Sequence, residues 1–177
     1  GVDALTVAGV MFAHDMRKGF PLLTTKKMPW KLIATELQFF IRGFTDKRWL
    51  QERNNHIWDE WANPKKAPYG HDEKAKKAMF DERDLGPIYG FQWRHFGAPY
   101  ENWDTNYAEC GVDQLKRLVA TLKENPNDRR MLVSAWNPAA LKEMALPPCH
   151  WAFQVTVMDH ALNLLWNQRS VDTALGL

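Results

Sequence analysis

Residues 149–168 read CHWAFQVTVMDHALNLLWNQ, and this stretch decides the fold of the chain. Two runs of β-branched, aromatic and other apolar residues flank the tripeptide Asp159-His160-Ala161. This pattern predicts two strands, 149–158 and 162–168, joined by a tight turn. If the chain reverses at Asp159, Arg169 lies within a residue or two of the position opposite Cys149. The hairpin therefore predicts a thiol and a guanidinium side by side.

Other elements are expected on the N-terminal side of this hairpin. Apolar residues at 112, 115, 118, 119 and 122 recur at helical spacing. Asn137-Pro138 is a favourable N-cap and first-turn pair. We expect strands at 4–12 and 131–136, and helices at 30–41, 112–122 and 137–144. The lysine-rich stretch 63–84 contains Pro64, Pro68 and Gly70, and we expect an exposed insertion there.

Composition argues against a dedicated nucleic-acid binder. The 177 residues include 23 Lys+Arg and 21 Asp+Glu, a net charge of +2, whereas such binders usually carry a strong basic excess. An alternative is a nucleic-acid-binding module built on the lysine run of 63–84, although the same run fits a solvated loop. Its lysines are Lys65, Lys66, Lys74, Lys76 and Lys77.

Cysteine usage and hydropathy indicate in which cellular compartment the protein is expected. Two cysteines, Cys110 and Cys149, make no disulfide framework, so a reducing cytoplasm is expected. The sequence has no run of about 18 apolar residues and no recognisable signal peptide, so a membrane is not expected as a partner. It also has no Walker loop, dinucleotide fingerprint or metal-spaced Cys/His cluster, so no metal is expected.

Glu36 is the first candidate for chemistry. When residues 30–42 are wound at about 100° per residue, Glu36 falls inside the apolar arc, between Leu32 and Phe40. A carboxylate there loses hydration, which raises its pKa and suits it to proton shuttling. The alternative is a structural glutamate that reaches a buried arginine or a backbone donor.

Cys149 and Arg169 are the second candidate. Pro147-Pro148 stiffens the backbone before Cys149, and a guanidinium beside a thiol favours the nucleophilic thiolate. The alternative is a buried structural cysteine, the more common role of a lone cysteine. His150 alternates to the opposite strand face, so a direct Cys–His pair is not expected.

An anion site is the third candidate. Asp128-Arg129-Arg130 places two guanidiniums at a turn, and Arg169 and Ser170 add a third guanidinium and a hydroxyl. Arginine, serine and a helix N-terminus together suit a phosphate. On a strand, however, Arg129 and Arg130 would face opposite ways, and solvated surface charge is the alternative.

Several segments together resemble the thymidylate synthase family, the folate-dependent methylases of deoxyuridylate. They are 84–94 (DLGPIYGFQWR), 127–130 (NDRR), 134–137 (SAWN), 144–150 (MALPPCH) and 168–172 (QRSVD), with 20–27 (FPLLTTKK) and 57–61 (IWDEW) in support. They follow the family order across essentially the whole chain, and their combination is highly specific.

The resemblance implies an α+β fold, with a mixed, twisted β-sheet, helices packed on one face, and a sheet face used for dimerisation. Residues 1–177 would form a single catalytic domain that lacks the family's N-terminal loop and C-terminal part. The implied reaction is reductive methylation of dUMP to dTMP, with 5,10-methylenetetrahydrofolate as carbon and hydride donor and dihydrofolate as product. The implied assembly is a homodimer.

Residue roles carry over position by position. Cys149 resembles the nucleophile that adds to C6 of dUMP, and Glu36 the carboxylate that organises water and proton transfer. Arg169 resembles the arginine that holds the phosphate and steadies the thiolate, while Tyr89 and His150 would join the catalytic network. The implied dUMP-binding residues are Arg129 and Arg130 of the partner subunit, Gln168, Arg169, Ser170, Val171 and Asp172. The implied folate-binding residues are Ile57, Trp58, Trp61, Asp172, Leu175 and Gly176.

Two alternatives accompany this interpretation. A hydroxymethylase acting on dUMP or dCMP would use the same cysteine, arginine and glutamate, but water instead of hydride would complete its reaction. An inactive homologue is the other, although Cys149, Arg169 and Glu36 are all in place. Pro29 and Ala174 depart from the residues that the family commonly has at those positions.

Overall fold

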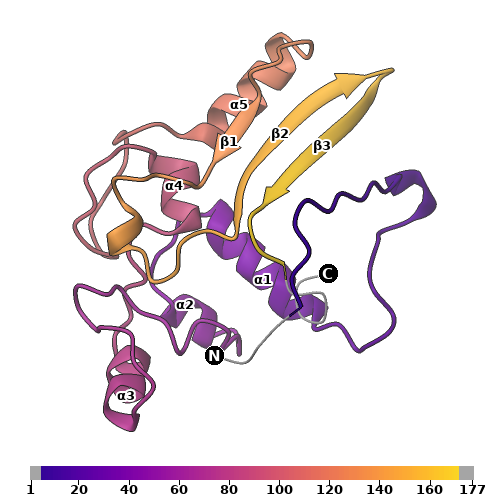
Figure 1. The fold of residues 1–177 in the computed structure, drawn as a ribbon. Helices are drawn as coiled ribbons and strands as arrows, with labels where there is room; N and C mark the ends of the chain where they lie inside the picture. The colour runs from indigo at the N-terminus through magenta and orange to yellow at the C-terminus, as the bar shows by residue number, and fades with distance from the viewer. Residues whose placement is uncertain (1–4, 172–177) are drawn as a thin grey trace.

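The computed structural model describes residues 5–171. Along the chain its elements are η1 (Met16–Lys18), α1 (Trp30–Ile41), α2 (Arg48–Gln51), α3 (Glu73–Asp81), α4 (Tyr89–His95), α5 (Gln114–Glu124), β1 (Leu132–Ser134), η2 (Leu141–Glu143), β2 (His150–Met158) and β3 (Ala161–Gln168). One end of the β2–β3 hairpin lies near α1 and α4, and its tip extends away from them (Figure 1).

The predicted hairpin is confirmed. β2 pairs antiparallel with β3 from Met158 opposite Ala161 to His150 opposite Gln168, with an irregularity between His150 and Ala152. Asp159 and His160 have φ angles of 51° and 59°. A type I′ turn needs positive φ at both central residues, and its twist matches that of the strands it joins. This two-residue turn sets the register of the whole hairpin.

The sheet is antiparallel within residues 5–171, in the order β1-β2-β3, so the expectation of a mixed sheet is wrong for this part of the chain. A parallel pair needs a crossover connection, whereas the chain between β1 and β2 reverses direction. α4 and α5 both contact β1, which is consistent with an α+β arrangement.

Two predicted elements are wrong. Residues 5–12 form no strand, because a strand needs a hydrogen-bonded neighbour and none of the described segments pairs with them. Residues 137–144 form a turn and the short η2 instead of an α-helix. The next N–H, that of Ala145, donates to the Leu85 carbonyl at 2.9 Å, so a tertiary bond replaces the next helical one.

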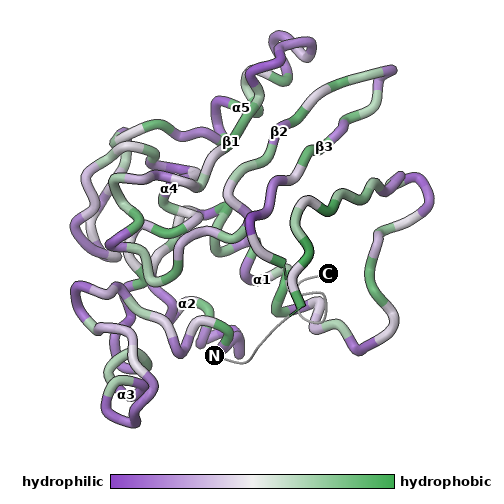
Figure 2. The backbone as a smooth tube through the Cα atoms, in the orientation of Figure 1, coloured by the Kyte–Doolittle hydropathy of each residue, from purple (hydrophilic) through white to green (hydrophobic). Residues whose placement is uncertain are grey.

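The helices confirm the periodicity arguments, with one correction. α1 has the predicted bounds, and α5 begins two residues later than expected because Asp113 caps it by accepting from the Lys116 N–H. The predicted apolar arc of α1 is only partly covered, since Phe39 and Phe40 are buried but Leu37 is 46% exposed. Figure 2 shows further apolar residues on the segment before α1, where side chains such as Val10 are exposed.

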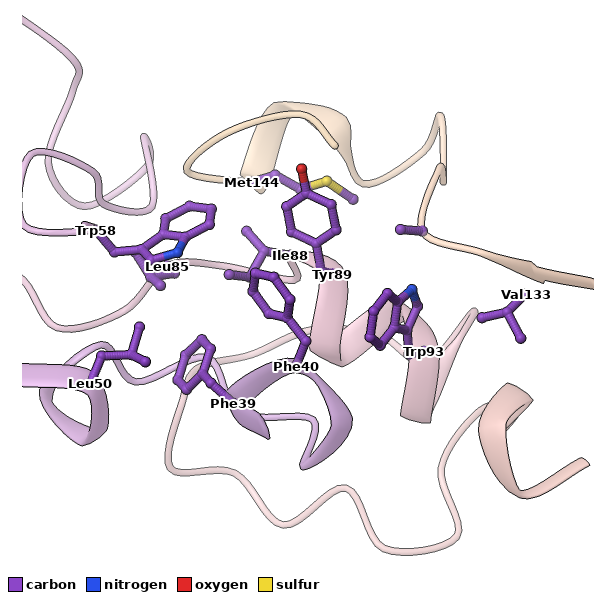
Figure 3. Close-up of a cluster of buried hydrophobic side chains, with 11 residues drawn as sticks. Phe39, Phe40, Leu50, Trp58, Leu85, Ile88, Tyr89, Trp93, Val133 and Met144 are labelled. Atoms are coloured by element: carbon purple, nitrogen blue, oxygen red, sulfur yellow. The ribbon is translucent and has the colours of Figure 1, made fainter. Parts of the chain in front are cut away.

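The core joins α1 to α4. Phe40 stacks on Tyr89 with ring centroids 4.7 Å apart, and Trp58 and Trp93 meet Phe40 edge-on (Figure 3). Gly90 permits this close approach, because a Cβ there would lie 2.9 Å from the Phe40 carbonyl oxygen. Tyr89 is thereby fixed at the first position of α4, with its ring in the core.

The lysine-rich stretch 63–84 is exposed at most of its lysines but anchored at both ends. Asn63 is 3% exposed and Asp84 is fully buried. Lys66 Nζ lies 2.5 Å from Asp84 Oδ2, and Met79 of α3 packs with Ala62 and Ala67 in a small second core. The stretch therefore has a defined structure of its own.

Candidate active site

Cys149 and Arg169 meet where the hairpin begins and ends. The Arg169 N–H donates to the Cys149 carbonyl at 2.9 Å, which continues the β2–β3 ladder by one step. Arg169 Nη2 lies 3.6 Å from the Cys149 Sγ, and the thiol is partly exposed. The predicted proximity of thiol and guanidinium is therefore confirmed.

The guanidinium of Arg169 is held by two proline carbonyls. Its Nε donates to the Pro148 oxygen at 2.9 Å and its Nη2 to the Pro147 oxygen at 2.8 Å. Proline restricts the backbone that carries these acceptors, so the fork is oriented before any ligand arrives. The face of the Trp136 ring lies 5.9 Å from the guanidinium carbon. These acceptors are backbone atoms, which residue types alone do not reveal.

Tyr89 connects the core to the cysteine. Its hydroxyl accepts the Cys149 N–H at 2.7 Å, and burial raises the pKa of the phenol above its ordinary value. The phenol therefore keeps its proton at neutral pH, so the hydroxyl that accepts from Cys149 also retains an O–H donor. α4, which is buried from Tyr89 to Trp93, sets the position of this group.

His150 is stacked between two aromatic rings. Its ring centroid lies 4.2 Å from that of Tyr89 and 5.1 Å from that of Trp166. Burial lowers the pKa of His150 to about 4, so the imidazole is neutral at pH 7. No bond between His150 and Cys149 occurs among the described hydrogen bonds, in keeping with the expectation from strand alternation.

Glu36 lies on α1 and faces Trp58. The indole N–H donates to Glu36 Oε1 at 2.7 Å, so its partner is neither an arginine nor a backbone donor. Burial raises the pKa of Glu36, and the Trp58 hydrogen bond acts in the opposite direction. The Trp58 ring meets that of Tyr89 edge-on, with centroids 6.4 Å apart. Glu36, Trp58, Tyr89, Cys149 and Arg169 therefore form one continuous series of contacts.

The residues after β3 are exposed. Gln168 donates through its amide to the Ser170 carbonyl at 3.0 Å, and the side chains of Ser170 and Val171 are open to solvent. No helix begins at Arg169 or Ser170 within the described residues. Asp172, Leu175 and Gly176 lie outside the described residues.

Arg129 and Arg130 are not brought to Cys149 within this chain. They precede β1, and the Arg129 carbonyl accepts from Gln154 at 2.9 Å. The Val155 N–H donates to Met131, and at about 3.3 Å per residue Val155 lies about 20 Å along β2 from Cys149. Arg129 and Arg130 are both exposed, and 90% of the Arg130 side-chain surface is open to solvent.

Three of the six residues implied for the folate side lie in one turn. Ile57 is 45% exposed, Trp58 is buried, and Trp61 stacks on Tyr69 with centroids 5.2 Å apart. A buried lysine, Lys47, donates to backbone carbonyls of this turn. Sequence reasoning missed Lys47, because nothing in the surrounding charged residues marks one of them as buried.

Four of the five lysines of 63–84 lie beside carboxylates. Lys65, Lys66, Lys76 and Lys77 lie within 2.5–3.5 Å of carboxylate oxygens, those of Glu143, Asp84, Glu73 and Asp81 respectively. Carboxylates therefore intersperse the positive charge of this stretch, whereas a nucleic-acid interface is typically a clustered basic patch.

Residues 5–171 lack two further features. This part of the chain contains no group of three or more His, Cys, Asp or Glu side chains arranged to hold a metal ion. None of its helices has the length and hydrophobicity needed to cross a membrane.

Comparison with known proteins adds to this geometry. A sequence model of the family described as Thymidylate synthase matches residues 1–177. The chain belongs to the thymidylate synthase family. The thymidylate synthase of Herpesvirus ateles is 47% identical over 179 residues, and that of Bos taurus is 44% identical over 180 residues. A bifunctional dihydrofolate reductase-thymidylate synthase of Zea mays is 44% identical over 177 residues.

These thymidylate synthase relatives are longer than this chain. Each alignment covers 100% of the chain, but only 59% of the Herpesvirus ateles protein and 49% of the Bos taurus protein. In the maize protein the alignment covers 33% of the length.

Proposed function

We propose that the protein carrying this chain converts dUMP to dTMP, with 5,10-methylenetetrahydrofolate as co-substrate. The observation that carries the proposal is the 3.6 Å approach of Arg169 Nη2 to the Cys149 Sγ, beside the phenol of Tyr89. Membership of the thymidylate synthase family supports the choice of substrates. The free thiols of Cys110 and Cys149 suit the cytoplasm as the compartment.

The reaction begins at the thiolate. Cys149 Sγ adds to C6 of the uracil ring, which makes C5 an enolate-like nucleophile. C5 then attacks the one-carbon unit of the folate, and a base removes the C5 proton. Tetrahydrofolate leaves and returns a hydride to the exocyclic methylene. The thiolate is expelled at the end, so that dTMP and dihydrofolate are the products.

Residues of this chain supply the charge and proton positions for these steps. Arg169 stabilises the thiolate, and its Nη1, which makes no hydrogen bond to the described residues, is left for the nucleotide phosphate together with Ser170. Glu36, with its raised pKa, exchanges a proton near the pyrimidine. Tyr89 and the neutral His150 complete a polar edge around the reacting carbon atoms.

The remaining contacts are proposed from the family resemblance. We place Gln168, Val171 and Asp172 on the nucleotide, and Ile57, Trp58, Trp61, Asp172, Leu175 and Gly176 on the folate. We assign Arg129 and Arg130 to the nucleotide of the partner subunit in a homodimer. Their distance along β2 from Cys149 of the same chain supports that assignment.

A spectroscopic dihydrofolate assay tests the reaction. The full-length protein with dUMP and methylenetetrahydrofolate is expected to form dihydrofolate and dTMP in equal amounts. Formation of a hydroxymethylated nucleotide without dihydrofolate would identify a hydroxymethylase instead. Absence of both products would overturn the proposed activity.

Subunit complementation tests the homodimer. Cys149→Ala and the double variant Arg129→Ala/Arg130→Ala are each expected to be nearly inactive. After the two are mixed and the subunits exchanged, about a quarter of the wild-type activity should return, because half of the dimers are mixed and each holds one complete site. No recovery from variants that do exchange subunits would show that the arginines serve their own chain.

A further inference from the structure

Lys47 is a buried cation at the start of α2, and only 1% of its surface is exposed. Its Nζ donates to the carbonyl oxygens of Asp59 at 3.1 Å and Trp61 at 2.9 Å, and also to that of Met79. A lysine ammonium has three N–H donors, so all of them are used on backbone oxygens. A buried charge is costly unless it is hydrogen-bonded in this way. The three carbonyl oxygens in turn depend strongly on the lysine as their donor.

Two of these acceptors belong to the turn that carries Trp58. The carbonyls of Asp59 and Trp61 flank Glu60, and the Trp61 N–H donates back to the Trp58 oxygen at 3.1 Å. Gln51 of α2 adds a bond to Asp59 Oδ1 at 2.8 Å. The turn is therefore fastened to α2 from several sides, with Lys47 as its most buried link.

The third acceptor, the Met79 carbonyl oxygen, couples the lysine-rich stretch 63–84 to Lys47 Nζ. Met79 belongs to α3, and its side chain fills the small core with Ala62 and Ala67. The Lys47 N–H donates to the Arg83 carbonyl at 2.9 Å, which ties down the end of the stretch as well. One lysine therefore joins α2, the turn at 58–61 and the segment around α3.

We propose that Lys47 is a positioning residue that fixes the turn at 58–61, and through it holds the Trp58 indole against Glu36. The hydrogen bonds run from Lys47 Nζ to the turn backbone, and from Trp58 Nε1 to Glu36 Oε1 at 2.7 Å. An apolar side chain at 47 leaves three carbonyls without their donor, so the turn must shift to reach other donors. Only the meaning of Glu36 for catalysis rests on the proposed function; the mechanical link does not.

The ionisation of Glu36 reports this link directly. In Lys47→Met the Trp58 indole loses its fixed position, and the hydrogen bond that favours the Glu36 carboxylate weakens. We expect the pKa of Glu36 to rise above its wild-type value, as measured by carboxyl-carbon NMR of the full-length protein with Glu36→Gln as the assignment reference. Trp58→Phe should produce a similar rise, and the double variant Lys47→Met/Trp58→Phe no further rise.

Lys66→Met is the matched control. It also removes a lysine from a mostly buried contact, the 2.5 Å pair with Asp84, but it has no bond to the turn at 58–61. It should lower the temperature of unfolding while leaving the pKa of Glu36 unchanged. A purely structural role of Lys47 predicts the same outcome for Lys47→Met, and that result, alongside a clear rise in Trp58→Phe, would overturn the proposal.

A second variant covers the case in which Lys47→Met does not fold. Lys47→Gln keeps two N–H donors on a shorter stem, and it should give a smaller rise in the pKa of Glu36. An unchanged Glu36 pKa in folded Lys47→Gln would also overturn the proposal. If the wild-type protein forms dTMP, kcat of these variants should fall by about tenfold with KM for dUMP changed by less than about twofold. If it forms none, the NMR comparison still decides the role of Lys47.

Discussion

The two ends of the β2–β3 hairpin lie in different surroundings, although one antiparallel ladder joins them. At the root, Cys149 and Arg169 meet the phenol of Tyr89, and His150 is stacked between rings. At the tip, Asp159 and His160 form a turn exposed to solvent, and Leu162 is 62% exposed. Strand pairing therefore sets register at both ends, but only the root, where other segments surround it, has the contacts needed for chemistry.

Removing the thiol should have the largest effect, because it abolishes the chemistry at the root of the hairpin. In full-length Cys149→Ala we expect turnover to fall by at least about 10⁴-fold, because the covalent route is lost. The backbone bonds to Tyr89 and Arg169 remain, so the free energy of unfolding should change by less than about 1 kcal/mol. Mass spectrometry of the protein with 5-fluoro-dUMP and methylenetetrahydrofolate checks the covalent complex, and its persistence in the variant would exclude Cys149 as the nucleophile.

Arg169→Lys should weaken the root by a smaller amount. A lysine has one nitrogen, which cannot bond both proline carbonyls, the sulfur and a phosphate at once. We expect kcat/KM for dUMP to fall by about 10²–10³-fold, with weaker nucleotide binding in calorimetry. Nucleotide affinity equal to that of the wild type would contradict the assigned role.

Acid should destabilise the root through His150. Its folded pKa of about 4 lies below the unfolded value near 6.5, so the unfolded chain binds more protons between these pH values. The contribution is fully favourable above the unfolded pKa and is lost as pH falls toward 4, by about 3 kcal/mol at most. Denaturant unfolding at several pH values measures it. His150→Phe keeps a stacked ring without a titrating group and should flatten this slope; an equal slope in both proteins would assign it to other groups.

At the tip, His160→Gly should stabilise the protein slightly. His160 has a φ of 59°, and glycine adopts this region without the strain caused by a Cβ. We expect a gain of about 0.5–1 kcal/mol in the free energy of unfolding, with no change in turnover. Ala161→Gly, one residue later and inside β3, is the control and should destabilise instead. A loss of activity in His160→Gly would show that the tip is not independent of the root.

Sequence patterns predicted the parts of the fold that local interactions decide. The hairpin follows from strand propensity and a two-residue turn, and the proximity of Arg169 to Cys149 follows from its register. α1 follows from helical periodicity. The absent helix at 137–144 was beyond such arguments, because the bond from Ala145 to Leu85 arises only when distant segments meet.

The features of the site also divide into those that local sequence predicts and those that arise only when distant segments meet. Desolvation of Glu36 was predictable from its place on a helix, but its partner Trp58 lies on another segment. The Pro147 and Pro148 carbonyls that orient Arg169, and those that bind Lys47, belong to the backbone. Residue identity gives no signal for them, because every residue carries the same carbonyl group.

Position 86 has a consequence for how this chain can diverge. Any Cβ at Gly86, which has a φ of +72°, would lie 1.9 Å from the Glu143 oxygen. The backbone that would have to move, at Glu143 and Met144, leads within a few residues to Pro147, Pro148 and Cys149. In a mutational library selected for new nucleotides, intolerance at 86 would therefore report a shifted main chain several residues away rather than a lost ligand contact.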